Sequence, residues 1–284
     1  MKIDEVLTHT IVGIYSSTAI APTLFLKGGS AMRLFDNLTS RISIDADFSV
    51  VDGIKGEKKF FNAIKSCVGV EFRKLKYDVF DFKQVRRPKK RAAHSPDWWG
   101  GWACEFKLVS FRYRGKEDSV KRRHALIPDG ANSSKILIDI SEHEYCGKKR
   151  AIIIQGVRVL GYSRELLVLE KMRAICQQHP DYVYRSSKNR ARDFYDIYEL
   201  TANVEDSFAL SCSRHIKKVF GAKEVPLELL SSLWNESFID EQRRGFNEVK
   251  DTVSGVIHDF GVYLEHLRFL IKEICPSIMD KSVS

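Results

Sequence analysis

The spacing of apolar residues changes character a little past the middle of the chain. Before about residue 160, most apolar runs are short and rich in β-branched residues, which is typical of strands. From Ser163 onward, apolar residues recur at intervals of three and four, which is the period of an amphipathic helix. The pattern therefore predicts an α/β domain over residues 1–160, followed by an all-helical domain over residues 161–284.

The first domain contains one clear strand–turn–helix unit and one clear alternating strand. A short strand, Thr23–Leu26, runs into a Lys-Gly-Gly-Ser turn, and a helical pattern begins at Ala31. Residues 42–51 alternate, with Ile42, Ile44, Ala46 and Phe48 on one face and Ser43, Asp45, Asp47 and Ser49 on the other. Further strands are expected at 70–85, 102–113, 135–141 and 150–159, and a helix at 58–68.

The second domain has a recognisable start. Ser163 suits the N-cap position of a helix whose apolar stripe includes Leu166, Leu169 and Met172. Further helices are expected at 189–200, 208–220 and 227–234, and a long helical segment, continuous or interrupted, over 239–275, where Pro276 ends it.

Positive charge is concentrated in one third of the chain. The 284 residues carry a net charge of +9, but residues 51–150 hold 24 basic and 13 acidic side chains, while the rest is nearly balanced. Six of the nine residues 83–91 are basic, and a second basic stretch follows at 112–124, with three tryptophans between the two. Such a region favours contact with RNA through residues 83–124. The alternative is a hairpin whose tryptophans pack on the core while its basic tip is solvated.

Several classes of protein are disfavoured. The six cysteines form no C-x-x-C pair, and no Walker A motif is present. No stretch reaches the roughly 18 apolar residues of a membrane span. The uncharged run Ile11–Leu26 is too polar for a signal peptide. We therefore expect a cytoplasmic protein with reduced cysteines and no membrane contact.

Three carboxylates carry the candidate chemistry. Asp45 and Asp47 are two residues apart in a strand, so their side chains lie side by side, and two like charges there are costly without a cation. Oxygen ligands at this spacing suit Mg²⁺. A third ligand is expected at Asp139, inside the apolar strand Ile136–Ile140, where an unpaired carboxylate is expensive.

The Gly28-Gly29-Ser30 turn adds a candidate phosphate cradle. Backbone N–H groups and a hydroxyl at a helix N-terminus bind phosphate well. Taken singly, a D-x-D pair is usually solvated, a Gly-Gly-Ser is usually a turn, and Asp139 suits an edge strand. A metal site beside a phosphate cradle is what nucleotidyl transfer needs.

The segments Lys27–Ala31 and Arg41–Phe48 resemble the first motif of the AbiEii/AbiGii-type toxins, nucleotidyltransferases of the DNA polymerase β superfamily. Residues 165–174 and 190–197 are similar to two later motifs of that family, and all follow the family's order over about residues 20–200. The resemblance implies a nucleotidyltransferase domain with a mixed sheet, followed by the helical domain, which contributes to the nucleotide and acceptor cleft.

The later motifs imply further site residues. In them Lys171 is placed to neutralise the triphosphate, Asp193 to orient Lys171 or bind the nucleotide, and Arg190 to bind the nucleotide. The alternatives are an exposed Lys171 paired with Glu170 or a nearby acid, and an Asp193 in the first turn of a helix, where the helix dipole favours a carboxylate. We expect Asp196 to be structural.

The implied activity is transfer of a nucleotide from an NTP to an acceptor hydroxyl, with two Mg²⁺ ions as cofactor, by the toxin of a toxin–antitoxin or abortive-infection system that has a cognate antitoxin. RNA, in particular a tRNA 3′ end, is the first choice of acceptor, a protein hydroxyl the second and a small molecule the third. The alternative from another class is a non-catalytic nucleic-acid-binding module on the same fold.

Overall fold

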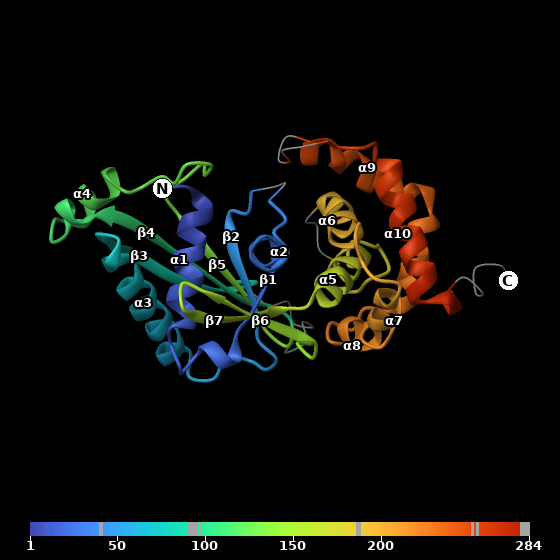
Figure 1. Cartoon of the computed structure of the whole chain (residues 1–284), viewed down its shortest axis with the longest axis horizontal. Helices are drawn as coiled ribbons and strands as arrows, with labels where there is room; N and C mark the ends of the chain where they lie inside the picture. The colour runs from blue at the N-terminus through green and yellow to red at the C-terminus, as the bar shows by residue number, and fades with distance from the viewer. Residues whose placement is uncertain are drawn as a thin grey trace. The chain divides into compact units, whose positions relative to one another are not determined.

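A seven-stranded sheet forms the centre of the N-terminal half of the computed structural model (Figure 1). The strand order is β3-β4-β5-β2-β1-β7-β6, in which β2 and β5, and β1 and β7, are parallel and the other neighbours antiparallel. The predicted mixed sheet is thereby confirmed. The strands are β1 (Phe25–Lys27), β2 (Asp45–Ser49), β3 (Tyr77–Arg87), β4 (Gly101–Ser110), β5 (Ile136–Ser141), β6 (Lys149–Ile154) and β7 (Val157–Tyr162).

The structure describes residues 1–39, 42–89, 96, 98–185, 189–250, 253 and 256–278. They form two units, the first reaching to Tyr162 and the second consisting mainly of the residues from Ser163 onward. The helices of the first unit are α1 (Ile3–Tyr15), α2 (Gly28–Asp36), α3 (Glu57–Lys74) and α4 (Asp118–Arg123), with short 3-10 turns at Ala21–Thr23 and Phe111–Tyr113.

One face of the sheet is covered by α1 and α3. Aromatic side chains of α3 pack on β4, where Phe61 lies 4.9 Å from Trp102 between ring centroids. The two helices approach closely at Gly13, where an added Cβ would lie 3.1 Å from the Cα of Val68. Alternation along β2 and β5 sends Ala46 and the β5 isoleucines into this core, where all are buried. Their neighbours, which include the aspartates, therefore lie on the other face.

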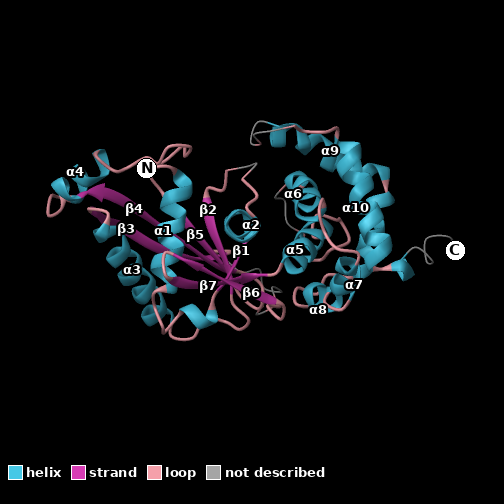
Figure 2. Cartoon of the chain, in the orientation of Figure 1, coloured by secondary structure: helices cyan, strands magenta, loops and turns pink. Residues whose placement is uncertain are grey.

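The second unit is built of helices alone among its described residues (Figure 2). The predicted N-cap is confirmed, since the Ser163 hydroxyl accepts a hydrogen bond from the Leu166 N–H. No described helix is both long enough and apolar enough to span a bilayer. The elements are α5 (Arg164–Cys176), α6 (Ala191–Thr201), α7 (Ser207–Ser213), α8 (Ile216–Gly221), α9 (Glu236–Lys250), α10 (Phe260–Ile274) and 3-10 turns at Leu227–Trp234 and Pro276–Ile278.

Several predicted element boundaries are wrong. Helix α3 continues to Lys74, so residues 70–74 are not strand, because the stripe that begins at Phe61 and Ile64 continues through Val68 and Phe72. Residues 150–159 are not one strand but parts of the hairpin β6–β7. Its turn is Gln155–Gly156, both at positive φ.

Two further differences lie near the N-terminus. Helix α1 is absent from the sequence prediction, although its buried residues recur at helical spacing. Strand β2 begins only at Asp45, and Ile42 and Ile44, predicted to share a buried face with Ala46, are about half exposed, at 49% and 55%.

Candidate active site

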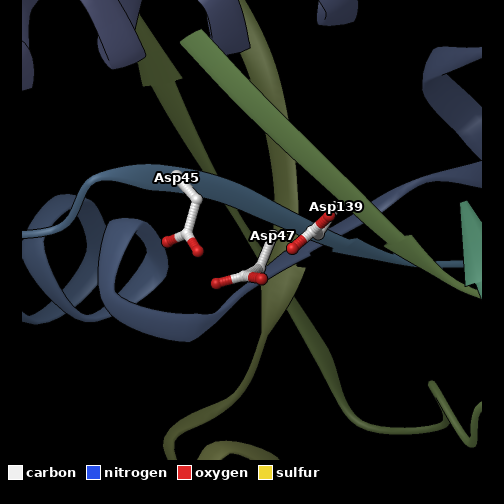
Figure 3. A group of neighbouring side chains, drawn as sticks. All are labelled: Asp45, Asp47 and Asp139. Carbon is white, nitrogen blue, oxygen red and sulfur yellow. The ribbon is translucent and has the colours of Figure 1, made fainter. Parts of the chain in front are cut away.

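Three aspartates lie together on the sheet face opposite α1 and α3. Asp45 and Asp47 belong to β2, and Asp139 belongs to the neighbouring parallel strand β5, directly opposite Asp47. Carboxylate oxygens of the three lie within 4.8 Å of one another, and all three residues are partly exposed. Their side chains gather on one side of the strands (Figure 3). The parallel pairing of β2 with β5 is what brings the two distant sequence segments together.

The electrostatics of this cluster favour a bound cation. Two carboxylates at such a distance repel by about 1 kcal/mol in bulk water and by about 3 kcal/mol at an effective dielectric constant of 20. Three partly exposed carboxylates that offer hard oxygen donors are a suitable donor set for Mg²⁺. On the other face, burial and, secondarily, the charge of Asp139 raise the pKa of the Cys104 thiol to about 12, so this cysteine is no nucleophile at neutral pH.

Gly28 makes room for one of the carboxylates. It follows β1, whose last residue, Lys27, pairs with Asp47. Gly28 has a φ of +63°, and an added Cβ there would lie 2.1 Å from the Oδ2 atom of Asp47. Only glycine satisfies both the left-handed backbone and the close approach.

We therefore expect Gly28→Ala to displace the Asp47 carboxylate and to lower nucleotide transfer roughly a hundredfold. Gly156→Ala is the matched control, because Gly156 also has a positive φ, of +79°, but an added Cβ would meet nothing within 4 Å. The control should cost about 1 kcal/mol of stability and leave transfer unchanged. Chemical denaturation and a transfer assay on both variants check this; equal activities would contradict it.

The serine of the predicted phosphate cradle is buried. The Ser30 hydroxyl donates to the backbone carbonyl of Asp45 at 2.9 Å, and the Ser43 hydroxyl donates to the same oxygen at 3.2 Å. The Ser30 side chain thus fixes the start of β2, whereas the sequence suggested that its hydroxyl would meet phosphate. Gly28 and Gly29 are the partly exposed residues of the turn.

Lys27 is part of the site but was not singled out from the sequence. It is 8% exposed, pairs with Asp47 across β1 and β2, and its Nζ lies 3.9 Å from Oε1 of the buried Glu144. A buried ammonium group needs negative neighbours. The available signal was a lysine at the end of an apolar strand.

In the second unit, Lys171 is the centre of a buried ion cluster. Its Nζ donates to Asp193 Oδ1 at 2.9 Å and to Asp196 Oδ2 at 2.6 Å, and Asp196 is fully buried. Arg190 extends the cluster, with Nη1 3.6 Å from Asp193 Oδ2. The expectation that Asp193 orients Lys171 agrees with these contacts. The alternative of an exposed Lys171 paired with Glu170 or a nearby acid is wrong as to exposure, because the Lys171 side chain is only 9% exposed, although its partners are nearby acids.

Much of the basic region is paired with acids. Arg122 makes two hydrogen bonds of 2.7 Å to Asp81 and, with burial opposing, holds the pKa of that carboxyl well below its usual range. Arg86 lies 3.1 Å from Glu142. Lys90 and Arg91 lie outside the described residues. The well-exposed basic residues among the described part of 83–91 are Lys83, Arg87 and Lys89.

Comparison with protein families decides the assignment. The family model "Nucleotidyl transferase AbiEii toxin, Type IV TA system" matches residues 13–266. The chain belongs to the AbiEii family. It is therefore a nucleotidyltransferase enzyme of a type IV toxin family, and this family implies an antitoxin partner. The alternative of a non-catalytic module is set aside, and the carboxylates that such a module would have lost are present.

Solved structures with detectable similarity to this AbiEii protein include two from Helicobacter pylori. JHP933 has 17% identity and a TM-score of 0.48, over 98% of this chain and 93% of that chain. A putative nucleotidyltransferase has 18% identity and a TM-score of 0.44, over 98% and 95%. An antigenic nucleotidyltransferase-like protein from Paracoccidioides brasiliensis has 14% identity and a TM-score of 0.37, over 78% and 93%. No curated protein matches the chain by sequence.

Proposed function

We propose that this AbiEii protein transfers a nucleoside monophosphate from an NTP to a hydroxyl group of RNA, such as a tRNA 3′ end, at a metal site formed by Asp45, Asp47 and Asp139. The observation that carries the proposal is the cluster itself, with carboxylate oxygens within 4.8 Å of one another on an accessible sheet face. Family membership supplies the reaction class. The metal, the nucleotide and the acceptor are what the proposal adds.

The donor set supports Mg²⁺, and two ions are the number we propose. When bound, Mg²⁺ would act as a Lewis acid at the α-phosphate and would stabilise the negative charge on the departing pyrophosphate. Asp45 and Asp47 would hold it from β2 and Asp139 from β5. The close contact between Gly28 and Asp47 supports this arrangement, because it places the Asp47 carboxylate directly against the backbone of the glycine turn.

The reaction itself is an in-line displacement. The acceptor oxygen forms a bond to the α-phosphorus, the bond from that phosphorus to the bridging oxygen breaks, and pyrophosphate leaves with the electron pair. In this proposal Asp139, which lies opposite Asp47 on β5, takes the proton of the attacking hydroxyl. The backbone N–H groups of Gly28, Gly29 and Ser30, at the start of α2, bind the NTP phosphates.

The helical unit contributes the cluster around Lys171. Asp193 and Asp196 hold the Lys171 ammonium group in place, and we assign Lys171 to charge compensation on the triphosphate. Arg190, whose side chain is 30% exposed, is assigned to nucleotide binding. The Asp193 carboxylate lies between the Lys171 ammonium group and the Arg190 guanidinium group and contacts both.

RNA is the acceptor that the charge distribution favours. The positive excess lies in residues 51–150, which include the aspartate of β5. Incubation of the protein with Mg²⁺, each α-labelled NTP and a mixture of total RNA and cell lysate tests the proposal. We expect label in a fraction that ribonuclease destroys and protease spares. Label that resists ribonuclease would identify a protein acceptor, and label in small molecules only would likewise overturn the RNA proposal.

A further inference from the structure

Two adjacent arginines of β3 lie on opposite faces of the sheet. Arg86 pairs with Trp102 and lies on the α3 side, with its guanidinium 5.3 Å from the Trp102 ring centroid and 3.1 Å from Glu142. Arg87 pairs with Gly101 and lies on the carboxylate side. Its Nη1 is 3.9 Å from Oδ1 of Asp139, and its side chain is 65% exposed. The two residues have different surroundings despite equal charge.

Arg87 reaches Asp139 across an intervening strand. Strand β4 separates β3 from β5, so the two backbones are about 10 Å apart at ordinary strand spacing. The β4 residues in these rows are Gly101, opposite Arg87, and Ala103, opposite Asp139. Their small size leaves the sheet face open for a long side chain. Position 101 admits no larger residue, because an added Cβ would lie 2.1 Å from the carbonyl oxygen of Ile140.

The contact between Arg87 and Asp139 is easily exchanged. At 3.9 Å it is too long for a hydrogen bond, and an exposed ion pair of this kind stabilises the folded protein only weakly. A guanidinium group binds a phosphate more strongly, through two parallel N–H···O bonds. In the proposed reaction Asp139 adjoins the attacking hydroxyl, and the nearest anion in an RNA acceptor is the phosphate of the same or the preceding nucleotide.

We infer that Arg87 binds a phosphate of the RNA acceptor beside Asp139 and so positions the attacking hydroxyl. This rests on the proposed function, and it makes Arg87 an acceptor-binding residue. The competing interpretation is that Arg87 only balances the charge of the carboxylates. Charge balance predicts a change in metal affinity, whereas acceptor binding predicts a change confined to RNA.

The test compares Arg87→Gln with Lys65→Gln, which removes the same charge from an exposed position of α3, on the opposite face of the sheet and outside residues 83–124. At saturating NTP, kcat/KM for RNA should fall about tenfold or more in Arg87→Gln and stay within about twofold in Lys65→Gln. Arg87→Lys should recover only part of the loss, because an ammonium group cannot bind bidentately. The KM for NTP and the affinity for Mn²⁺ should be unchanged.

A binding measurement decides the inference independently of transfer. The affinity for a fluorescent single-stranded RNA is measured by anisotropy at several salt concentrations. The slope of log affinity against log salt concentration should be about 0.7 less steep in Arg87→Gln, which corresponds to the loss of one phosphate contact. Unchanged RNA affinity and slope would overturn the inference, as would a loss of Mn²⁺ affinity that accounts for the loss of transfer. If the wild-type protein transfers no nucleotide to RNA, the proposed function fails, and the anisotropy result alone still decides whether Arg87 binds RNA phosphate.

Discussion

Asp47→Asn should lower the rate of nucleotide transfer by roughly a thousandfold or more, while the protein remains folded. Asp47 is the central member of the cluster, opposite Asp139 on β5 and two residues from Asp45 on β2. The substitution keeps the shape of the side chain but removes the negative charge that a divalent cation requires. The melting temperature should be equal to that of the wild type or higher, because like-charge repulsion is relieved.

The matched control is Asp118→Asn, which removes an exposed carboxylate from α4 in the same unit. This variant should retain full transfer, so a general effect of reduced negative charge is excluded. Steady-state transfer and thermal unfolding of the two variants give the comparison. Asp47→Asn with activity within threefold of the wild type would remove the carboxylate cluster from the mechanism.

Lys171→Met should lose both stability and transfer. Lys171 is bonded to two buried carboxylates, and removing one partner of a buried ion cluster costs about 3 to 5 kcal/mol. Loss of activity in this variant alone is therefore ambiguous, since an unfolded protein is also inactive. Lys171→Arg should retain part of the stability and part of the transfer, because the guanidinium group keeps the charge but is bulkier.

A compensated variant separates the two effects. Lys171→Met combined with Asp193→Asn and Asp196→Asn neutralises both carboxylates that contact Lys171 and gives up the longer 3.6 Å contact between Arg190 and Asp193. This variant should recover most of the lost stability. Transfer should stay below the wild type by at least about a hundredfold, since the charge that we assign to the triphosphate is still missing. Recovery of transfer together with stability would show that Lys171 is structural only. Urea denaturation and steady-state kinetics on the same preparations provide both quantities.

The carboxylate cluster was predictable because it depends on short-range rules. Alternation along a strand places Asp45 and Asp47 on one face, and an aspartate among the isoleucines of β5 is costly without a ligand or partner. The glycine turn is equally local. The structure adds the parallel pairing that sets Asp139 opposite Asp47, and the contact that makes Gly28 indispensable there. Whether these residues hold a metal stays a prediction.

The residues that the sequence did not single out are those whose surroundings come from distant segments. Lys27 is distinguished by its neighbours Asp47 and Glu144, and Arg87 by its reach to Asp139 across β4. Within the basic run, nothing local separates Arg86 from Arg87. Only the register of β3 against β4 shows that one is held by Glu142 while the other is exposed on the carboxylate face.

The boundary errors have similar causes. Helix α1 is absent from the sequence prediction, and its C-terminal half lies in the uncharged run Ile11–Leu26, which has features of a targeting segment. The pattern predicts one strand in place of the hairpin β6–β7 because its turn, Gln155–Gly156, is only two residues long and is flanked on both sides by β-branched residues. In α3, the helical stripe competes with β-branched residues near its end, and packing of Phe72 on Phe106 favours the helix.

The most direct test of the central claim is a titration of the protein with Mn²⁺ followed by electron paramagnetic resonance, because it measures metal binding without any assumption about nucleotide or acceptor. The wild type and Asp118→Asn should bind Mn²⁺ saturably, with Mg²⁺ competing, and Asp47→Asn should bind it at least about tenfold more weakly while folded. Equal Mn²⁺ affinity in the wild type and Asp47→Asn would contradict the account.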